Sequence, residues 1–132
     1  MNKHERVSYI ENYFSVLLTA AEVSDNIFVG TLPLVVDSDW EDMAYIEVQK
    51  MTDYDAYSDG SVLIYLYAKP TGSGSTLRKN VTRLNQMERA LDSAVEEARD
   101  DDYIIVEQWR DSGFDDDRNF HYDVISVSVT VR

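Results

Sequence analysis

The chain has 132 residues, of which 44% are hydrophobic and 11% aromatic, a composition typical of one folded domain over residues 1–132. Its 25 acidic and 12 basic residues give a net charge of −13, which disfavours binding to nucleic acid or to anionic lipid. The absence of cysteine excludes a disulfide framework and a thiolate zinc site, and we expect neither a signal peptide nor a membrane span.

The first expected element is an amphipathic helix over residues 5–22. Its apolar residues recur at intervals of three and four positions: Val7, Ile10, Phe14, Leu17, Leu18 and Ala21. The Ser-Asp-Asn segment 24–26 should end this helix, because its side chains compete for backbone hydrogen bonds. A short strand over residues 27–29 follows, and then a connection with Pro33 in which residues 34–36 suggest a brief edge strand.

Two strands are then expected over residues 44–51 and 61–68, separated by a polar turn that ends in Asp59-Gly60. The second strand is apolar on both faces, with Val62, Ile64 and Leu66 on one and Leu63, Tyr65 and Tyr67 on the other. We expect the helices to cover one face. The other is either covered by a neighbouring subunit or left as a tyrosine-rich surface in solvent, and the sequence leaves both readings open.

A second amphipathic helix is predicted over residues 76–98, with Ser75 or Thr76 as its N-cap. Its charges oppose the helix dipole, because basic residues lie near the positive end and acidic residues near the negative end. This pattern suggests that the basic residues meet acidic groups elsewhere in the chain or on a partner: Arg78, Lys79 and Arg83. The alternative is a solvated helix face on which the charges merely segregate.

Two further strands are predicted over residues 103–111 and 119–131, joined by an acidic loop over residues 112–118. In the last strand Phe120 and Tyr122 fall on the opposite parity from the later apolar residues, which predicts a bulge or a face that is covered differently there. The order α-β-β-β-α-β-β predicts an α+β fold, in which an antiparallel β-sheet has two long helices packed on one face.

No pattern in the sequence predicts catalysis, so we expect a protein that is not an enzyme and that uses no metal or cofactor. His4 and His121 lack partners at a catalytic spacing. Residues 37–42 and 53–60 resemble fragments of calcium loops but lack the required spacing of ligands and glycine. The acidic runs 100–102 and 115–117 are expected to remain in water.

The pattern as a whole resembles a known family. The first half of the pattern is a leading helix (HERVSYIENYFSVLLTAA), a short strand (IFVG) and a strand pair (AYIEVQKM with SVLIYLYA). The second half is a loop with a long helix (GSGSTLRKNVTRLNQMERALDSAV) and a closing strand pair (YIIVEQWRDSGFDDDRNFHYDVISVSVTVR). In order and pattern, over nearly the whole chain, these resemble the tail-terminator (tail-completion) proteins of long-tailed bacteriophages and prophages. The acidic insert 37–42 and the longer polar turn 53–60 depart from the pattern of that family.

The resemblance implies a virion structural protein that is assembled in the bacterial host cytoplasm. Its subunits would form a ring, usually a hexamer, that terminates the tail tube and joins it to the head connector. The implied partners are copies of itself, tail-tube proteins and connector proteins, with DNA passing through without specific binding and no membrane.

Charge and exposure nominate interface candidates for such a ring: Tyr65, Tyr67, Arg78, Lys79 and Arg83. Three residues of the acidic loop are candidates for an acidic lumen or loop surface: Asp115, Asp116 and Asp117. The alternative function is that of an acidic DNA mimic, which would inhibit a DNA-binding protein or a nuclease.

Overall fold

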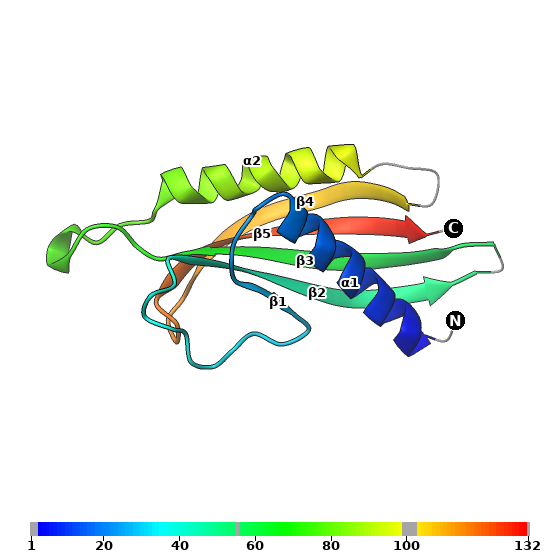
Figure 1. Cartoon of the computed structure of the whole chain (residues 1–132), viewed down its shortest axis with the longest axis horizontal. Coiled ribbons are helices and arrows are strands. Elements are labelled where there is room, and N and C mark those ends of the chain that lie inside the picture. The colour runs from blue at the N-terminus through cyan, green and yellow to red at the C-terminus, as the bar shows by residue number, and fades with distance from the viewer. Residues whose placement is uncertain (1–2, 55, 99–102, 132) are drawn as a thin grey trace.

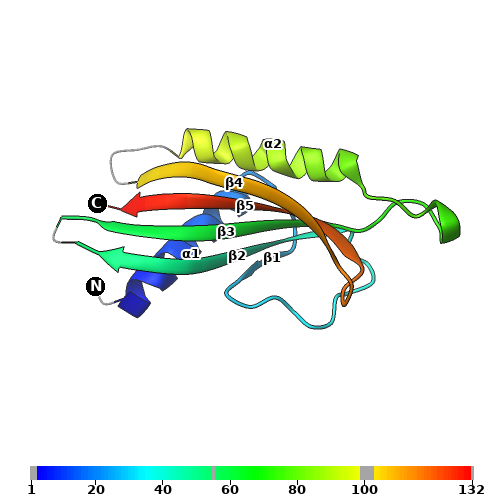
Figure 2. The same cartoon turned by 180° about the vertical axis from the view of Figure 1, so that it is seen from behind.

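The computed structural model of the chain describes residues 3–54, 56–98 and 103–131. Its elements are, in chain order, α1 (Lys3–Ala20), β1 (Ile27–Val29), β2 (Asp42–Asp53), β3 (Ser58–Ala68), the short 3-10 turn η1 (Gly74–Thr76), α2 (Val81–Glu97), β4 (Tyr103–Asp115) and β5 (Phe120–Val131). The strands form a single sheet in the spatial order β1-β2-β3-β5-β4. Both helices lie on the same face of this sheet (Figure 1, Figure 2), so the prediction of an α+β fold is confirmed.

The sheet is mixed, and the prediction of an antiparallel sheet is wrong at its β1 edge. β1 runs parallel to β2, with Ile27 beside Ala44 and Val29 beside Ile46. The other neighbouring strands, β2–β3, β3–β5 and β5–β4, are antiparallel. The connection over residues 30–41 explains the difference. It is as long as a parallel crossover requires, so the chain returns to the same end of the sheet before it enters β2.

Within that connection, the prediction of an edge strand over residues 34–36 is wrong. Leu34 and Val35 lie in a bend with their side chains exposed to solvent. The connection instead crosses the sheet face that lies away from the helices, where Leu32 and Val36 pack beside buried Met43.

The second helix begins later than predicted. Asn80 is its N-cap, because the Asn80 side chain accepts a hydrogen bond from the Arg83 backbone N–H at 3.1 Å. The predicted N-caps Ser75 and Thr76 lie instead in or beside η1. An extended loop thus separates β3 from α2.

β4 continues to Asp115, so the predicted acidic loop is shortened to a tight turn. The Asp115 side chain stabilises this turn, since its Oδ1 accepts hydrogen bonds from the backbone N–H groups of Asp117 and Arg118, both at 3.1 Å. Asn119 completes the turn in the left-handed region, with φ of 59°.

The main hydrophobic core lies between the two helices and one face of the sheet, which we call the helix face. Alternate residues of each long strand point into it, as the period of two requires. Its largest fully buried side chains come from both helices and four strands: Ile10, Phe14, Leu18, Leu84, Met87, Leu91, Ile46, Ile64, Leu66, Ile105 and Ile125.

The opposite face, which we call the open face, has a smaller apolar cluster around Met43, Tyr67 and Phe120. This cluster explains the parity change in the last strand. The register between β3 and β5 runs from Ser58 to Ala68 without a shift, so no bulge is present there. Phe120 and Tyr122 point to the open face because the connection over residues 30–41 and neighbouring tyrosines cover it at this end.

Candidate protein-interaction site

Four tyrosines from three adjacent strands lie together on the open face. Tyr45 of β2 is directly opposite Tyr65 of β3, and Tyr67 of β3 is directly opposite Tyr122 of β5. The ring centroids lie 5.7 Å apart for Tyr45 and Tyr65, 5.4 Å for Tyr67 and Tyr122, and 5.6 Å for Tyr65 and Tyr122. The strand registers therefore create a continuous aromatic floor from residues far apart in the sequence.

Carboxylates surround this floor. Glu47 lies two residues along β2 from Tyr45, and Asp115, Asp116 and Asp117 come from the end of β4 and the turn that follows it. Together with Phe114, these tyrosines and carboxylates line a shallow depression of about 540 Å³, which we call the tyrosine cleft. The structure thus brings together five residues that the sequence nominated separately: Tyr65, Tyr67, Asp115, Asp116 and Asp117.

The carboxylates of the tyrosine cleft differ in their partners. Asp115 forms an ion pair with Arg118 at 2.9 Å, and the Arg118 Nε donates a hydrogen bond to the Pro33 carbonyl at 2.8 Å. Within the described part of the chain, Glu47, Asp116 and Asp117 have no ion-pair partner. The rim therefore carries negative charge that the described residues do not neutralise.

Burial and this negative charge both favour the neutral form of the tyrosines. Burial raises the pKa of Tyr45 and Tyr65 above their usual value, and the charge of Glu47 adds to the effect on both. Burial also raises the pKa of Tyr67, with a further contribution from Asp115. The floor of the cleft thus remains a set of neutral aromatic rings beside carboxylates, an environment that attracts cations.

The three basic residues near the start of α2 have different surroundings. Arg83 is bound inside the chain, since its Nε lies 2.7 Å from an Asp42 carboxylate oxygen and its Nη2 donates to the Val23 carbonyl at 2.9 Å. Lys79 lies 3.2 Å from the Asp123 carboxylate. Arg78 is exposed and forms no ion pair among the described residues. Acidic groups within the chain therefore account for two of the three charges, and the interface role of all three stays a prediction.

Arg78 belongs to a loop over residues 69–80, which we call the arm. The arm projects beyond the end of the sheet in both ribbon views (Figure 1, Figure 2). Two backbone hydrogen bonds between Thr71 and Arg78 close it, at 2.9 and 3.0 Å, and a third joins Leu77 to Gly74 at 3.4 Å. It is a defined structure with most of its side chains in solvent.

A second exposed feature is the outer edge of β4. No other described strand pairs with this edge of the 13-residue strand. On the open face of β4, Ile104, Val106 and Trp109 are 41%, 48% and 49% exposed, respectively. This apolar row was not predicted from the sequence, although Ile104 and Val106 alternate with buried Tyr103 and Ile105 in the period of two that is typical of a strand.

A groove of about 400 Å³ lies on the helix face between α2 and β4. Its floor is apolar, with Leu91, Ile105 and Ile125, and Arg110 stands at its edge. Arg110 binds Glu107, Asp92 at 2.5 Å and Glu88 at 3.2 Å. Burial alone lowers the pKa of Arg110, but hydrogen bonds to Asp92 and Glu107 outweigh it and raise the pKa. The ion pairs of Arg110 at this groove therefore connect β4 to α2.

The histidines and acidic segments that were weighed as catalytic or metal-binding residues lie apart from one another. His4 is exposed at the start of α1, and the His121 ring lies 4.7 Å from that of Phe114. The Asp37 side chain accepts a hydrogen bond from the backbone N–H of Asp39, as in a simple turn. Among the described residues, no group of three or more acidic or histidine side chains is arranged to hold a metal ion. The acidic run 100–102 lies outside the described residues.

Comparisons with known proteins assign this chain to no family. No protein-family model matches the chain, and no curated protein matches it. Among the described residues, no helix is long and apolar enough to cross a membrane. The inference of function therefore depends on the open face, the arm and the edge of β4.

Proposed function

We propose that the chain is a structural subunit of a bacteriophage or prophage tail, and not an enzyme. Copies of it form a ring that terminates the tail tube and joins it to the head connector. The proposal follows the resemblance to tail-terminator proteins, and the exposed edge of β4 is the observation that carries it.

This edge favours assembly for a physical reason. A long, unpaired strand edge with apolar side chains pairs readily with other chains, and monomeric proteins usually protect such edges with lysine, proline or a covering segment. Along residues 104–109 β4 has no lysine and no proline, and its one described basic residue, Arg110, binds acidic residues of α2 and β4 itself. One irregularity, a register shift between Glu107 and Trp109, interrupts the strand, but Ile104, Val106 and Trp109 remain exposed beside it. A neighbouring subunit that covers the edge would remove the exposed apolar surface.

The charge of the chain is compatible with the same role. Carboxylates that bind cations of the chain itself include those of Asp42, Asp53, Glu88, Asp92, Glu107, Asp115 and Asp123. Glu47, Asp116 and Asp117 of the tyrosine cleft have no ion pair among the described residues. A ring with such acidic surfaces toward its lumen would let DNA pass without binding it. A DNA mimic would need a continuous row of free carboxylates, and this internal pairing gives that alternative less support.

The test is assembly of the purified protein, measured by light scattering and electron microscopy over a range of concentrations. We expect ring-shaped particles that also bind to one end of isolated tail tubes. Val106→Lys should weaken assembly, because it places a charge on the apolar edge of β4. Val16→Lys on α1 is the matched control, since it adds the same charge at a valine that is 59% exposed but lies on a helix and not on the edge strand. A monomer that neither assembles nor binds tube ends would contradict the proposal.

A further inference from the structure

We propose that the tyrosine cleft receives the arm of a second copy of this chain. The Arg78 guanidinium would lie against the tyrosine rings, between the carboxylates of Glu47, Asp116 and Asp117. This inference rests on the proposed function, because it identifies one joint of the proposed assembly.

The tyrosine cleft has the chemistry of a site for a cationic side chain. Four tyrosine rings form its floor, and three carboxylates on its rim have no ion-pair partner among the described residues. Tyr67 is only 5% exposed, and its ring packs against those of Tyr65 and Tyr122, with centroids 6.1 and 5.4 Å away. A guanidinium both stacks on aromatic rings and donates several hydrogen bonds to carboxylates and hydroxyls, so it suits this combination better than an ammonium does.

The arm and the start of α2 have the complementary charge. Residues 69–87 contain four of the 12 basic residues of the chain and no acidic residue, although the chain has 25 acidic residues in total. Within this segment Lys69, Lys79 and Arg83 each bind a group of their own chain. Arg78 is the exposed member without an ion pair among the described residues, and its neighbour Leu77 is 51% exposed.

The arm is also already ordered. The paired backbone hydrogen bonds between Thr71 and Arg78 hold Arg78 at a fixed place on a projecting structure. A loop that is fixed before it binds loses less conformational entropy on binding than a flexible one. The arm therefore presents Leu77 and Arg78 as a preformed contact that its own chain leaves unused.

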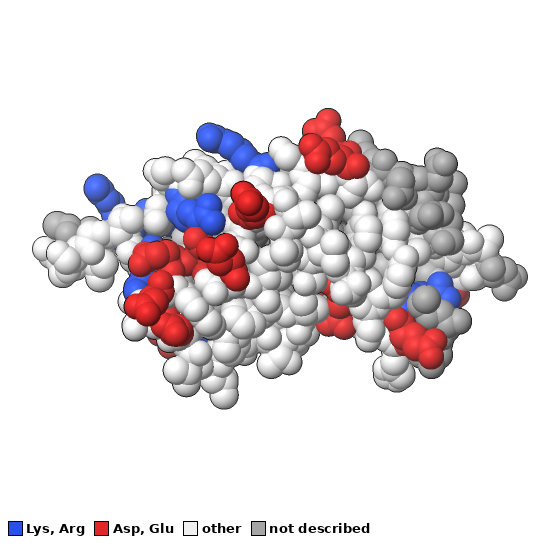
Figure 3. Space-filling view, viewed as in Figure 1, with Lys and Arg blue, Asp and Glu red and all other residues white. Residues whose placement is uncertain are grey.

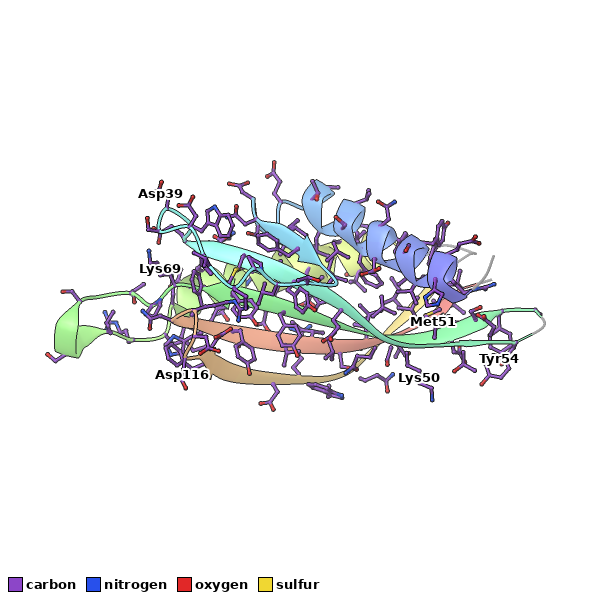
Figure 4. The ribbon with its side chains drawn as sticks, turned by 90° about the horizontal axis from the view of Figure 1, so that it is seen from below. Asp39, Lys50, Met51, Tyr54, Lys69 and Asp116 are labelled. Carbon is purple, nitrogen blue, oxygen red and sulfur yellow. The ribbon has the colours of Figure 1, made fainter. Side chains whose placement is uncertain are left out.

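A second copy of the chain is the occupant that these observations favour, because one chain carries both halves of the contact and neither half has an ion-pair partner within residues 3–54, 56–98 and 103–131. Figure 4 shows Asp116 near the end of the sheet from which the arm extends, whereas Lys50 and Tyr54 lie toward the other end. Figure 3 shows the face of the molecule on which α1 lies, where basic and acidic side chains both gather at the arm-bearing end. When the arm of one copy enters the cleft of the next and the contact is not reciprocated, the interface is heterologous, and such interfaces form a closed ring where the rotation between copies allows closure.

A pair of charge reversals tests this contact. Arg78→Glu places a carboxylate on the arm, and Asp116→Arg places a guanidinium in the tyrosine cleft. Each variant alone should assemble at least about tenfold more weakly than the unmodified protein, since each puts like charges together at the joint. An equal mixture of the two should recover assembly, because each arm then finds a cleft of opposite charge. Arg89→Glu is the matched control, since it makes the same change at an exposed arginine of α2.

The outcomes separate this inference from the proposed function. If the unmodified protein assembles and neither reversal weakens assembly more than Arg89→Glu does, the proposed contact between arm and cleft is wrong, whereas the proposed ring is not contradicted. If each reversal weakens assembly and the mixture does not recover it, the pairing of Arg78 with Asp116 is also wrong. If the unmodified protein never assembles and does not bind tube ends, both proposals fail.

Cross-linking gives a second readout, because the chain has no cysteine of its own. Ser75→Cys lies on the arm and Asp117→Cys on the rim of the cleft, and both keep Arg78 and Asp116. When the two variants are mixed and oxidised, we expect disulfide-linked pairs between them. Ser93→Cys, exposed on α2, replaces the arm variant in the control. A yield no higher than that of the control would overturn the proposed contact.

Discussion

The helix face and the open face of this sheet are built from the same strands but are buried in different ways. On the helix face, Ile46, Ile64 and Ile125 are fully or almost fully buried beneath two helices. On the open face, the same strands carry polar and aromatic residues that are only partly covered, such as Glu47, Tyr65 and Ser128. The comparison indicates that the first face determines stability, whereas the second is available for contacts with other chains.

A large-to-small substitution on the helix face should give the largest effect on stability. Phe14 of α1 is fully buried, so Phe14→Ala should lower the free energy of unfolding by about 3–5 kcal/mol, measured by urea denaturation. Val16 lies on the exposed side of the same helix, and Val16→Ala should change the free energy of unfolding by less than about 0.5 kcal/mol. Similar losses for both variants would contradict the assignment of the faces.

Substitutions of two basic residues near the start of α2 should give the next largest difference in unfolding free energy. Arg83→Ala leaves the Asp42 carboxylate and the Val23 carbonyl without their partner, and should cost about 2 kcal/mol of unfolding free energy. Arg78→Ala should cost less than about 0.5 kcal/mol in the monomer, because Arg78 is exposed on the arm. Thermal or urea unfolding of both variants at low protein concentration measures this difference, and equal costs would contradict it.

The N-cap of α2 should have a smaller effect. Asn80→Ala removes the acceptor for the Arg83 N–H and should cost about 1 kcal/mol of unfolding free energy. Asn80→Gly should cost only a few tenths of a kcal/mol, since glycine is tolerated at this position. A cost below that of the glycine variant would argue that α2 begins elsewhere.

The tyrosine cleft predicts a dependence on alkaline pH. Tyr45, Tyr65 and Tyr67 have raised pKa values in the folded protein, so above pH of about 10 the unfolded chain loses these protons first. Stability should therefore be unaffected by these groups below that pH and should fall as the pH rises further. An absorbance titration should show these tyrosines ionising after the exposed ones, and Tyr67→Phe should remove part of the late phase.

Periodicity made the helix face predictable from the sequence. Apolar residues at helical spacing located α1, and alternation located the buried sides of β2, β3 and β5. The direction of β1 was not predictable in this way, because three residues carry no signal of parallel or antiparallel pairing and the connection after them looked like a loop with a strand. The start of α2 was misplaced because Asn80 competes as a cap with two earlier residues of similar preference.

The tyrosine cleft was predictable only in parts. The sequence nominated Tyr65, Tyr67 and the three aspartates, but as separate features, since only the strand registers bring β2, β3, β5 and the turn together. Tyr45, Glu47 and Tyr122 were missed. Their signal was the alternation in residues 44–51, which places Tyr45 and Glu47 on the side opposite Ile46 and thus on the face that Tyr65 shares.

Hydrogen exchange as a function of protein concentration tests most directly whether the open face and the β4 edge serve for contacts between copies. We expect amides of β4 and of the arm to become more protected as the concentration rises, while amides of Ile10, Phe14 and Leu18 stay equally protected throughout. Protection that is the same at all concentrations, in a protein that remains a monomer, would contradict the account.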